Sequence, residues 1–188
     1  KIVAGTKVES IKDIKTIDLM AQSGCSYISI SPESGSKDLM TKINKPFNID
    51  HAYKIVNQMN KKKIFSQACF VIGFPGETEN DLNLTKKMIF NLTKKGIDEI
   101  AIFIITPIPG SEIFNQLKGY TSLSELNFSP SWRSDYNYLF RKRIYFYLYF
   151  IFFKTIFFPF KILRQIINFF LKKFETKMEM VPYKYLKL

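Results

Sequence analysis

The nine residues at 70–78, FVIGFPGET, constrain the fold more than any other part of the chain. The apolar residues before the first glycine do not alternate with polar ones, which indicates a strand covered on both faces, as in a parallel sheet. Pro75 lacks an amide N–H and fixes φ, so neither a strand nor a helix continues through it. Gly73 and Gly76 permit positive φ and let a ligand approach the bare backbone. Because a helical pattern follows at once, the stretch is typical of the ligand-binding edge of a parallel α/β sheet.

Two further apolar runs end in the same manner. One closes with ESGS at 33–36, and the other closes with TPIPGS at 106–111. A single GFPG turn is equally well explained as a tight connection that binds nothing. Three strand ends near positions 32, 73 and 106 instead suit successive βα units, and this alternation predicts a parallel sheet with right-handed crossovers.

The spacing of apolar positions predicts the bounds of each element. We expect strands at 2–8, 26–31, 64–72 and 99–105, and helices starting after Ser10, at 34–43, at 49–61, at 79–95 and from 111 to 117. Ser10 and Asn48 are candidate N-caps, and Gly24 and Gly96 are candidate helix stops. A closed eight-stranded βα barrel needs about 250 residues. The fold class is therefore α/β, a partial parallel (β/α) barrel of about four units followed by a mostly helical tail.

The charge and the aromatic residues divide the chain. From Arg133 to the end there are 12 Lys and Arg against 3 Asp and Glu, which accounts for +9 of the net charge of +12. Eighteen of the 30 aromatic residues also follow Trp132. We therefore expect a partial barrel at 1–118, a linker at 119–134, and a basic, aromatic, amphipathic helical tail at 135–188.

The tail predicts contact with a membrane surface. A spanning helix needs about 18 or more apolar residues, and here Lys154 and Pro159 interrupt the apolar runs. Basic and aromatic helices lying on an anionic bilayer fit this pattern, which would place the protein in the cytoplasm, peripherally at the inner face of the membrane. Helices packed on the barrel or on another domain, and a true span, remain as alternatives.

Three stretches in order resemble the radical S-adenosylmethionine (radical SAM) enzymes. They are GCSYISISPESGS at 24–36, GFPGET at 73–78 and TPIPGS at 106–111, and the resemblance covers about residues 2–117. It is similar to the branch that often carries an upstream cobalamin-binding domain, and methylthiotransferases share the same turns. Pro32 departs from the family, which usually has Gly or Val there. The resemblance implies a partial barrel of six units, of which these strands match the third to the sixth.

The resemblance also implies a binding site for SAM. The residues that it assigns to this cofactor are Glu33, Ser34, Ile72, Gly73, Phe74, Pro75, Gly76, Glu77, Ile105, Thr106 and Pro107. The Glu33 carboxylate can accept hydrogen bonds from ribose hydroxyls, and the Ser34 hydroxyl can donate or accept one. Both residues are alternatively explained as parts of a turn and a helix cap. We expect Glu77 to brace its turn rather than to contact SAM.

The cysteines do not form the family's cluster motif. Radical SAM chemistry needs a [4Fe–4S] cluster held by three cysteine thiolates, usually spaced Cys-x-x-x-Cys-x-x-Cys. This chain has only Cys25 and Cys69, which we interpret as buried free thiols. The sequence therefore assigns no metal ligand and no catalytic residue, and the cluster ligands would lie outside this chain. The lone His51 is interpreted as a solvated helical residue.

Two main functions follow from these observations. The first is the distal part of a radical SAM enzyme, acting on a small-molecule or lipid-like substrate, with SAM, a [4Fe–4S] cluster and, through an upstream domain, cobalamin as the cofactors that the resemblance suggests. Such a chain would be inactive by itself. The alternative is a non-catalytic truncated barrel whose tail binds a membrane or a partner. An ordinary phosphate-binding βα barrel is a weaker third idea. A nucleic-acid partner is not favoured, because the lysines at 61–63 suit a solvated helix end.

Overall fold

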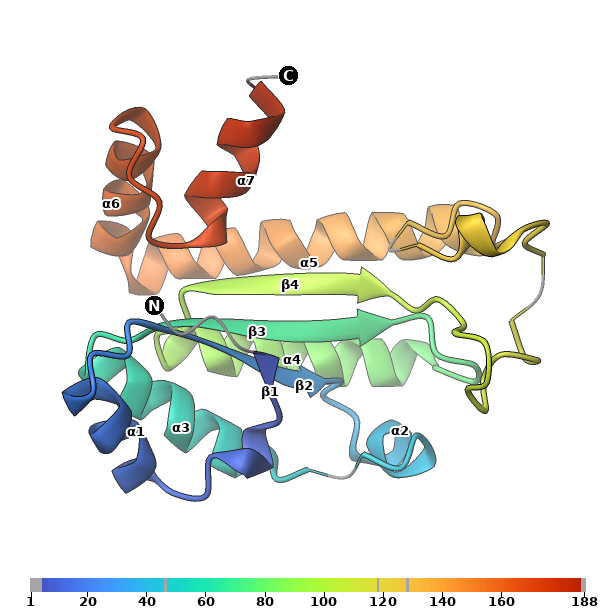
Figure 1. Ribbon diagram of the computed structural model, residues 1–188, viewed down its shortest axis with the longest axis horizontal. Helices are drawn as coiled ribbons and strands as arrows, with labels where there is room; N and C mark the ends of the chain where they lie inside the picture. Colours follow the sequence, from blue (N-terminus) through green and yellow to red (C-terminus); the bar gives the residue numbers. More distant parts are fainter. Residues whose placement is uncertain (1–4, 46, 118, 128, 187–188) are drawn as a thin grey trace.

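The computed structural model describes residues 5–45, 47–117, 119–127 and 129–186. These residues form one four-stranded parallel sheet in the order β1-β2-β3-β4 (Figure 1). The strands are β1 Gly5–Thr6, β2 Tyr27–Glu33, β3 Phe65–Ile72 and β4 Glu99–Ile104. In the register of the sheet, Ala68 lies between Ile30 and Ile100. Strands that are sequential, parallel and joined by helices confirm the predicted fold class, a partial (β/α) barrel.

Helices connect the strands and continue beyond the sheet. The connecting helices are α1 Ile14–Gln22, α2 Lys37–Lys42, α3 Ile49–Lys61 and α4 Glu79–Lys94, with a short 3₁₀ turn η1 at Val8–Ser10. The later elements are a 3₁₀ turn η2 at Leu123–Glu125 and the helices α5 Tyr136–Phe157, α6 Pro159–Phe170 and α7 Lys177–Leu186. The helical tail that the sequence predicts is therefore present.

The core lies on one face of the sheet. Apolar residues at even positions of β2, β3 and β4 join the buried side chains of α3, α4 and α5 in one cluster. Odd positions carry polar residues on the opposite face, such as Tyr27, Gln67 and Glu99. Because side chains alternate along a strand, the odd positions form a second face, which mixes these polar residues with apolar ones such as Val71 and Phe103.

Local capping signals set the helix boundaries that the sequence predicts best. The Asn48 side chain accepts a hydrogen bond of 3.1 Å from the His51 amide, so α3 begins where the sequence indicates. Thr78 and Asp81 form a reciprocal capping box at the start of α4. Gly96 has a φ of 91° just after α4 ends, as expected for a glycine stop.

The structure corrects the predictions for two helices. The segment 111–117 is not a helix: the Ser111, Phe114 and Gln116 amides make separate i→i+3 turn bonds that do not continue into a ladder. Ser10 is not an N-cap, because it belongs to η1. Asp13 caps α1 instead, and accepts a hydrogen bond of 2.9 Å from the Thr16 amide.

Other bounds differ by a few residues at the element ends. The first strand is limited to Gly5–Thr6 among the described residues, and predicted positions 2–4 lie outside them. The expected strand at 26–31 extends to Glu33, and the expected helix at 34–43 shortens to α2. The shortening follows from the tight turn at 33–36, whose last residue, Ser36, caps α2 through the Leu39 amide.

Helix α5 packs along the β4 edge of the sheet (Figure 1). Leu139, Phe146 and Phe150 are buried in the main core. The Ile102 amide, on the edge strand, donates a hydrogen bond of 3.0 Å to the Tyr147 hydroxyl. The first helix of the tail is thus packed on the barrel, which is one of the alternatives left open by the sequence. Within the described residues no single helix meets the length and composition test for a membrane span; α5 and α6 meet it only together, and they are bent by 113°.

Replacing Phe150 by Ala tests whether α5 belongs to the core. Phe150 is 1% exposed, so its truncation should lower the free energy of unfolding by about 3–5 kcal/mol. The matched control is Phe152→Ala on the same helix, which should change stability by no more than about 0.5 kcal/mol because Phe152 is 61% exposed. Denaturant unfolding measures both. Equal effects from the two substitutions would contradict the packing of α5.

Candidate functional site

The carboxyl ends of β2, β3 and β4 surround a pocket of about 420 Å³. Its walls include Glu33 from the end of β2, Phe74 from the GFPGET turn, and Ile105 and Thr106 from the segment after β4. Lys45 also lines it. Residues that are 30 or more positions apart in sequence therefore meet at one edge of the sheet, where ligands of parallel α/β proteins bind.

A second pocket of about 550 Å³ lies next to the first. Phe74 and Ile105 line both pockets, and Pro75 lines the second. Ile72 and Pro107 are buried, and Ile72 belongs to the core cluster on the helix side of the sheet. The structure thus brings most of the predicted site residues to one edge, with a subset of their side chains at the pocket surface.

The GFPGET turn is braced by its own glutamate. Gly73 and Gly76 have φ values of 85° and 76°, which favour glycine. The Gly73 amide donates a hydrogen bond of 2.5 Å to Oε2 of Glu77, and the Glu77 amide donates one of 3.0 Å to the Phe74 carbonyl. Glu77 therefore holds the turn, in line with the role expected from the sequence.

The second carboxylate oxygen of Glu77 has an unusual environment. Oε1 is buried and has no hydrogen-bond partner among the described residues. Burial raises the pKa of Glu77 to about 7, against the opposing effect of the Gly73 hydrogen bond. This carboxyl group consequently titrates near neutral pH.

Arg133 ties the ends of two strands together. Its guanidinium donates hydrogen bonds of 3.0 Å to the Gly73 carbonyl and 3.0 Å to the Ile105 carbonyl. It also forms an ion pair of 2.7 Å with Asp135, and this arginine holds the pKa of Asp135 below its usual range. Because Arg133 is 7% exposed, these bonds fix the spacing between the β3 and β4 turns.

Sequence reasoning missed Arg133 because it lies inside the segment that we expected to be a linker. The Ile105 and Gly73 carbonyls that it binds are 28 and 60 positions away in sequence, so no local pattern indicates these contacts. The one local signal is the arginine two positions before an aspartate at a helix start. A Cβ atom on Gly73 would lie 3.2 Å from the Arg133 guanidinium and 2.6 Å from Leu139, so the glycine also makes room for this contact.

Glu33 faces the pocket from a strained backbone position. Its φ is 61°, and the register between β2 and β3 shifts between Ile30 and Glu33, around the unusual Pro32. The carboxylate accepts a hydrogen bond of 3.1 Å from Lys45 Nζ, and 16% of the side chain remains exposed. A non-glycine residue in the left-handed region is uncommon, and such positions cluster at functional sites.

Ser34 is placed differently from Glu33. It is fully buried, and its hydroxyl lies 3.1 Å from Thr85 Oγ1 and accepts a hydrogen bond of 3.1 Å from the Ser36 amide. A Cβ atom on the adjacent Gly35 would lie 2.4 Å from the Leu84 carbonyl, so the turn is pressed against α4. These contacts agree with the alternative interpretation of Ser34 as a turn residue.

The cysteines lie apart from this site. Cys25 is buried in the helix-side core, whereas Cys69 is half-buried on the polar face, with Sγ 3.3 Å from Ser29 Oγ. Burial raises the pKa of Cys69. Across the part of the chain that the structure describes, no group of three or more His, Cys, Asp or Glu side chains is arranged to hold a metal ion.

The chain is similar to known proteins over part of its length. No family model matches the chain. It is 28% identical over 116 residues to bacteriochlorophyllide d C-12(1)-methyltransferase of Chlorobaculum tepidum, covering 61% of this chain and 25% of that protein. It is 28% identical over 87 residues to tRNA-2-methylthio-N(6)-dimethylallyladenosine synthase of Ehrlichia chaffeensis, covering 45% of this chain and 19% of that protein. The matches thus span a quarter or less of these two relatives.

Two solved structures share the fold. One is the coproporphyrinogen III oxidase HemN of Escherichia coli, described as a radical SAM enzyme, with a TM-score of 0.55 and 15% identity over 76% of this chain and 32% of that one. The other is the radical SAM methyltransferase TsrM of Kitasatospora setae, with cobalamin and a [4Fe–4S] cluster bound, with a TM-score of 0.52 and 13% identity over 61% of this chain and 22% of that one. At these identities the likeness concerns the fold.

Replacing Arg133 by Met tests its role as a clamp. The substitution leaves two backbone carbonyls without their donor, so the free energy of unfolding should fall by about 2–4 kcal/mol. The control is Arg141→Met, an exposed arginine on α5, which should cost no more than about 0.5 kcal/mol. Comparable stability of the two variants in a denaturant titration would show that the clamp contributes nothing.

Glu77 should make stability depend on pH. Because its folded pKa is about 7 and lies above the ordinary carboxyl value, the folded state binds the proton more tightly than the unfolded state does. The stabilisation is complete below the unfolded pKa and is lost as the pH rises through about 7. From pH 5 to pH 8 the wild type should lose about 2–3 kcal/mol more than Glu77→Gln. Unfolding midpoints across this range measure the difference, and parallel curves would refute the assignment.

Proposed function

We propose that the chain is the C-terminal part of the core domain of a radical SAM protein, and that the edge formed by the carboxyl ends of β2, β3 and β4 binds SAM. The observation that carries this proposal is the pocket in which Glu33, Phe74 and Ile105 meet. Glu33 and Phe74 belong to the first and second motif stretches, and Ile105 directly precedes the third. The pocket volume of about 420 Å³ lies within the range of small-molecule sites.

The residues at this edge suit the nucleoside part of SAM. The Glu33 carboxylate can accept hydrogen bonds from two ribose hydroxyls, with Lys45 balancing its charge. Phe74 and Ile105 offer apolar surface to an adenine ring. Arg133 holds the two turns that bear these side chains at a fixed spacing. In this proposal the chain binds and orients the cofactor and shields it from water.

The described residues do not fit an iron–sulfur cluster. Such clusters are held by cysteine thiolates, and Cys25 and Cys69 lie on opposite faces of the sheet. We infer that the three cluster ligands are supplied by another segment, and that this chain by itself is inactive. Bound to such a cluster, SAM is the source of a 5′-deoxyadenosyl radical by reductive cleavage. Cobalamin, bound in TsrM, is a further cofactor that we propose for the longer protein.

The substrate that we propose is a small molecule or a lipid-like compound. A non-catalytic partial barrel that binds a membrane or a partner is the alternative, and the lack of a cysteine triplet in the sequence favours it. The DNA upstream of Lys1 separates the two: a Cys-x-x-x-Cys-x-x-Cys motif in frame supports the enzyme, and an in-frame stop codon supports the alternative.

Binding of 5′-methylthioadenosine, the nucleoside half of SAM, tests the site in this chain. We expect saturable binding in ligand-detected NMR, and Glu33→Gln should weaken it about tenfold because charge-assisted hydrogen bonds to the ribose are lost. Glu112→Gln is the matched control, since Glu112 is exposed and lines only the second pocket.

The outcomes separate the two pockets. An affinity that falls with Glu33→Gln and not with Glu112→Gln supports the assignment. An affinity that responds only to Glu112→Gln would move the nucleoside to the second pocket and contradict it. Absence of saturable binding by the wild-type chain would overturn the proposed site.

A further inference from the structure

Helix α6 turns its polar side toward the protein. Lys161 Nζ donates hydrogen bonds of 2.8 Å to the Gly96 carbonyl and 2.8 Å to Asp98. One helical turn later, the Gln165 side chain accepts a hydrogen bond of 2.8 Å from Lys154. Asn168, which is buried, donates one of 2.7 Å to Glu175. The inward face of this helix is therefore a row of satisfied polar side chains.

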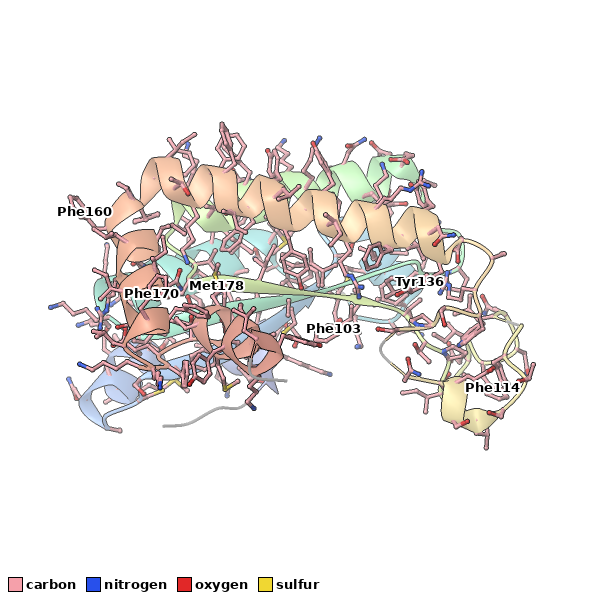
Figure 2. The ribbon with its side chains drawn as sticks, turned by 90° about the horizontal axis from the view of Figure 1, so that it is seen from above. Phe103, Phe114, Tyr136, Phe160, Phe170 and Met178 are labelled. Atoms are coloured by element: carbon pink, nitrogen blue, oxygen red, sulfur yellow. The ribbon has the colours of Figure 1, made fainter. Side chains whose placement is uncertain are left out.

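The opposite side of α6 is apolar and exposed. We define the α6 outer face as the side chains of Phe160, Leu163, Ile166, Ile167, Phe170 and the adjoining Leu171, whose exposed fractions run from 47% to 82%. Their spacing places them on one side of a helix. Phe160 lies at the outer edge of the molecule, where α6 leaves α5 (Figure 2). A surface helix of a globular protein normally buries its apolar stripe, so α6 is reversed.

The reversal is fixed by the fold. Turning α6 over would break the ion pair between Lys161 and Asp98 and would leave Lys154 and Asn168 without Gln165 and Glu175. Buried polar groups that lose their partners cost more than exposed apolar groups do. The outer face is therefore held outward by specific bonds, and it is available to an apolar partner.

Positive charge rims this surface. Lys172 and Lys173 are both exposed directly after Leu171, and Arg164, which is 60% exposed in its side chain, forms an ion pair with Glu175. The segment from Arg133 onward carries a net +9. An apolar stripe edged by basic residues is the pattern of a helix that lies in the interface of an anionic bilayer.

We propose that the α6 outer face docks on an anionic lipid bilayer, with α6 in the plane of the interface. At 12 residues, α6 is about 18 Å long, too short to cross a hydrocarbon core of about 30 Å. A second copy of this chain fits less well, because a symmetric contact would bring the two basic rims together. Further strands of a larger barrel would join the sheet beyond β1, at the edge opposite β4, and so on the side away from α5. The proposal holds whether or not the chain binds SAM.

Vesicle co-sedimentation of the full 188-residue chain tests the proposal. Vesicles of phosphatidylcholine with about 30 mol% phosphatidylglycerol should bind at least about tenfold more tightly than pure phosphatidylcholine, and added salt should weaken the binding. Leu163→Glu with Ile167→Glu should reduce binding by at least about tenfold. Lys172→Gln with Lys173→Gln should reduce it about fivefold for each lysine.

Matched variants keep the test specific. Leu19→Glu on α1 places the same change at a side chain that is 63% exposed, and Lys12→Gln with Lys15→Gln removes two exposed lysines near α1. Neither should alter vesicle binding. Circular dichroism and thermal unfolding establish that each variant is folded.

Three results would overturn the proposal. The first is equal binding to anionic and neutral vesicles. The second is vesicle binding that is unchanged by Leu163→Glu with Ile167→Glu. The third is a chain that ignores vesicles and forms a concentration-dependent dimer in sedimentation analysis, which the same double variant abolishes; in that case a second copy covers the α6 outer face.

Discussion

Strand β4 lies at the edge of the sheet, and the rest of the structure depends on how that edge is covered. An edge strand presents unpaired backbone groups that must be covered or solvated. Here α5 covers them, with the Tyr147 hydroxyl accepting from the Ile102 amide. At 22 residues, α5 is about 33 Å long, while a six-residue strand spans about 20 Å. The helix therefore extends past the strand, and the residues around its two ends organise different parts of the molecule.

At the carboxyl end of β4, the start of α5 brings Arg133 and Asp135 to the motif turns, so the spacing of the candidate site is set by the covering helix. At the amino end, Lys154 donates to the Asp98 carbonyl and to Gln165 of α6. Burial lowers the pKa of Lys154 to about 8. Burying a lysine this deeply costs free energy. Its hydrogen bonds to the Asp98 carbonyl and to Gln165 offset that cost, and the bond to Gln165 also orients α6.

Sequence reasoning succeeded where the determining contacts are local. The cap at Asn48 and the start of α4 at Thr78 depend on partners within three residues, and the parallel sheet follows from the alternation of strand and helix patterns. It failed at 111–117, where the sequence has helical spacing but the backbone forms only isolated turn hydrogen bonds. It also missed Arg133, whose partners are remote in sequence.

The tail shows a different limit of periodicity. A repeat of apolar residues gives the angle between side chains, and it does not say which side of the helix faces inward. In α5 the apolar side chains of Leu139, Phe146 and Phe150 join the core, whereas the side of α6 that faces the protein is polar. The deciding groups in α6 are Lys161 and Asn168, whose acceptors become visible only once the chain is folded. The same residue spacing is thus consistent with two opposite surfaces.

The GFPGET turn carries an electrostatic cost that its neighbours offset only in part. When Glu77 is ionised, its buried Oε1 has no donor among the described residues, and a buried unpaired acceptor costs about 1–3 kcal/mol. Arg133 is close enough to lower the pKa of Glu77, but its charge is already paired with Asp135, and burial prevails. The proton that Glu77 retains near neutral pH therefore relieves the turn. The turn depends on two glycines with positive φ, on a buried carboxyl group and on an arginine that is remote in sequence. A tight connection between a strand and a helix does not require all of these features.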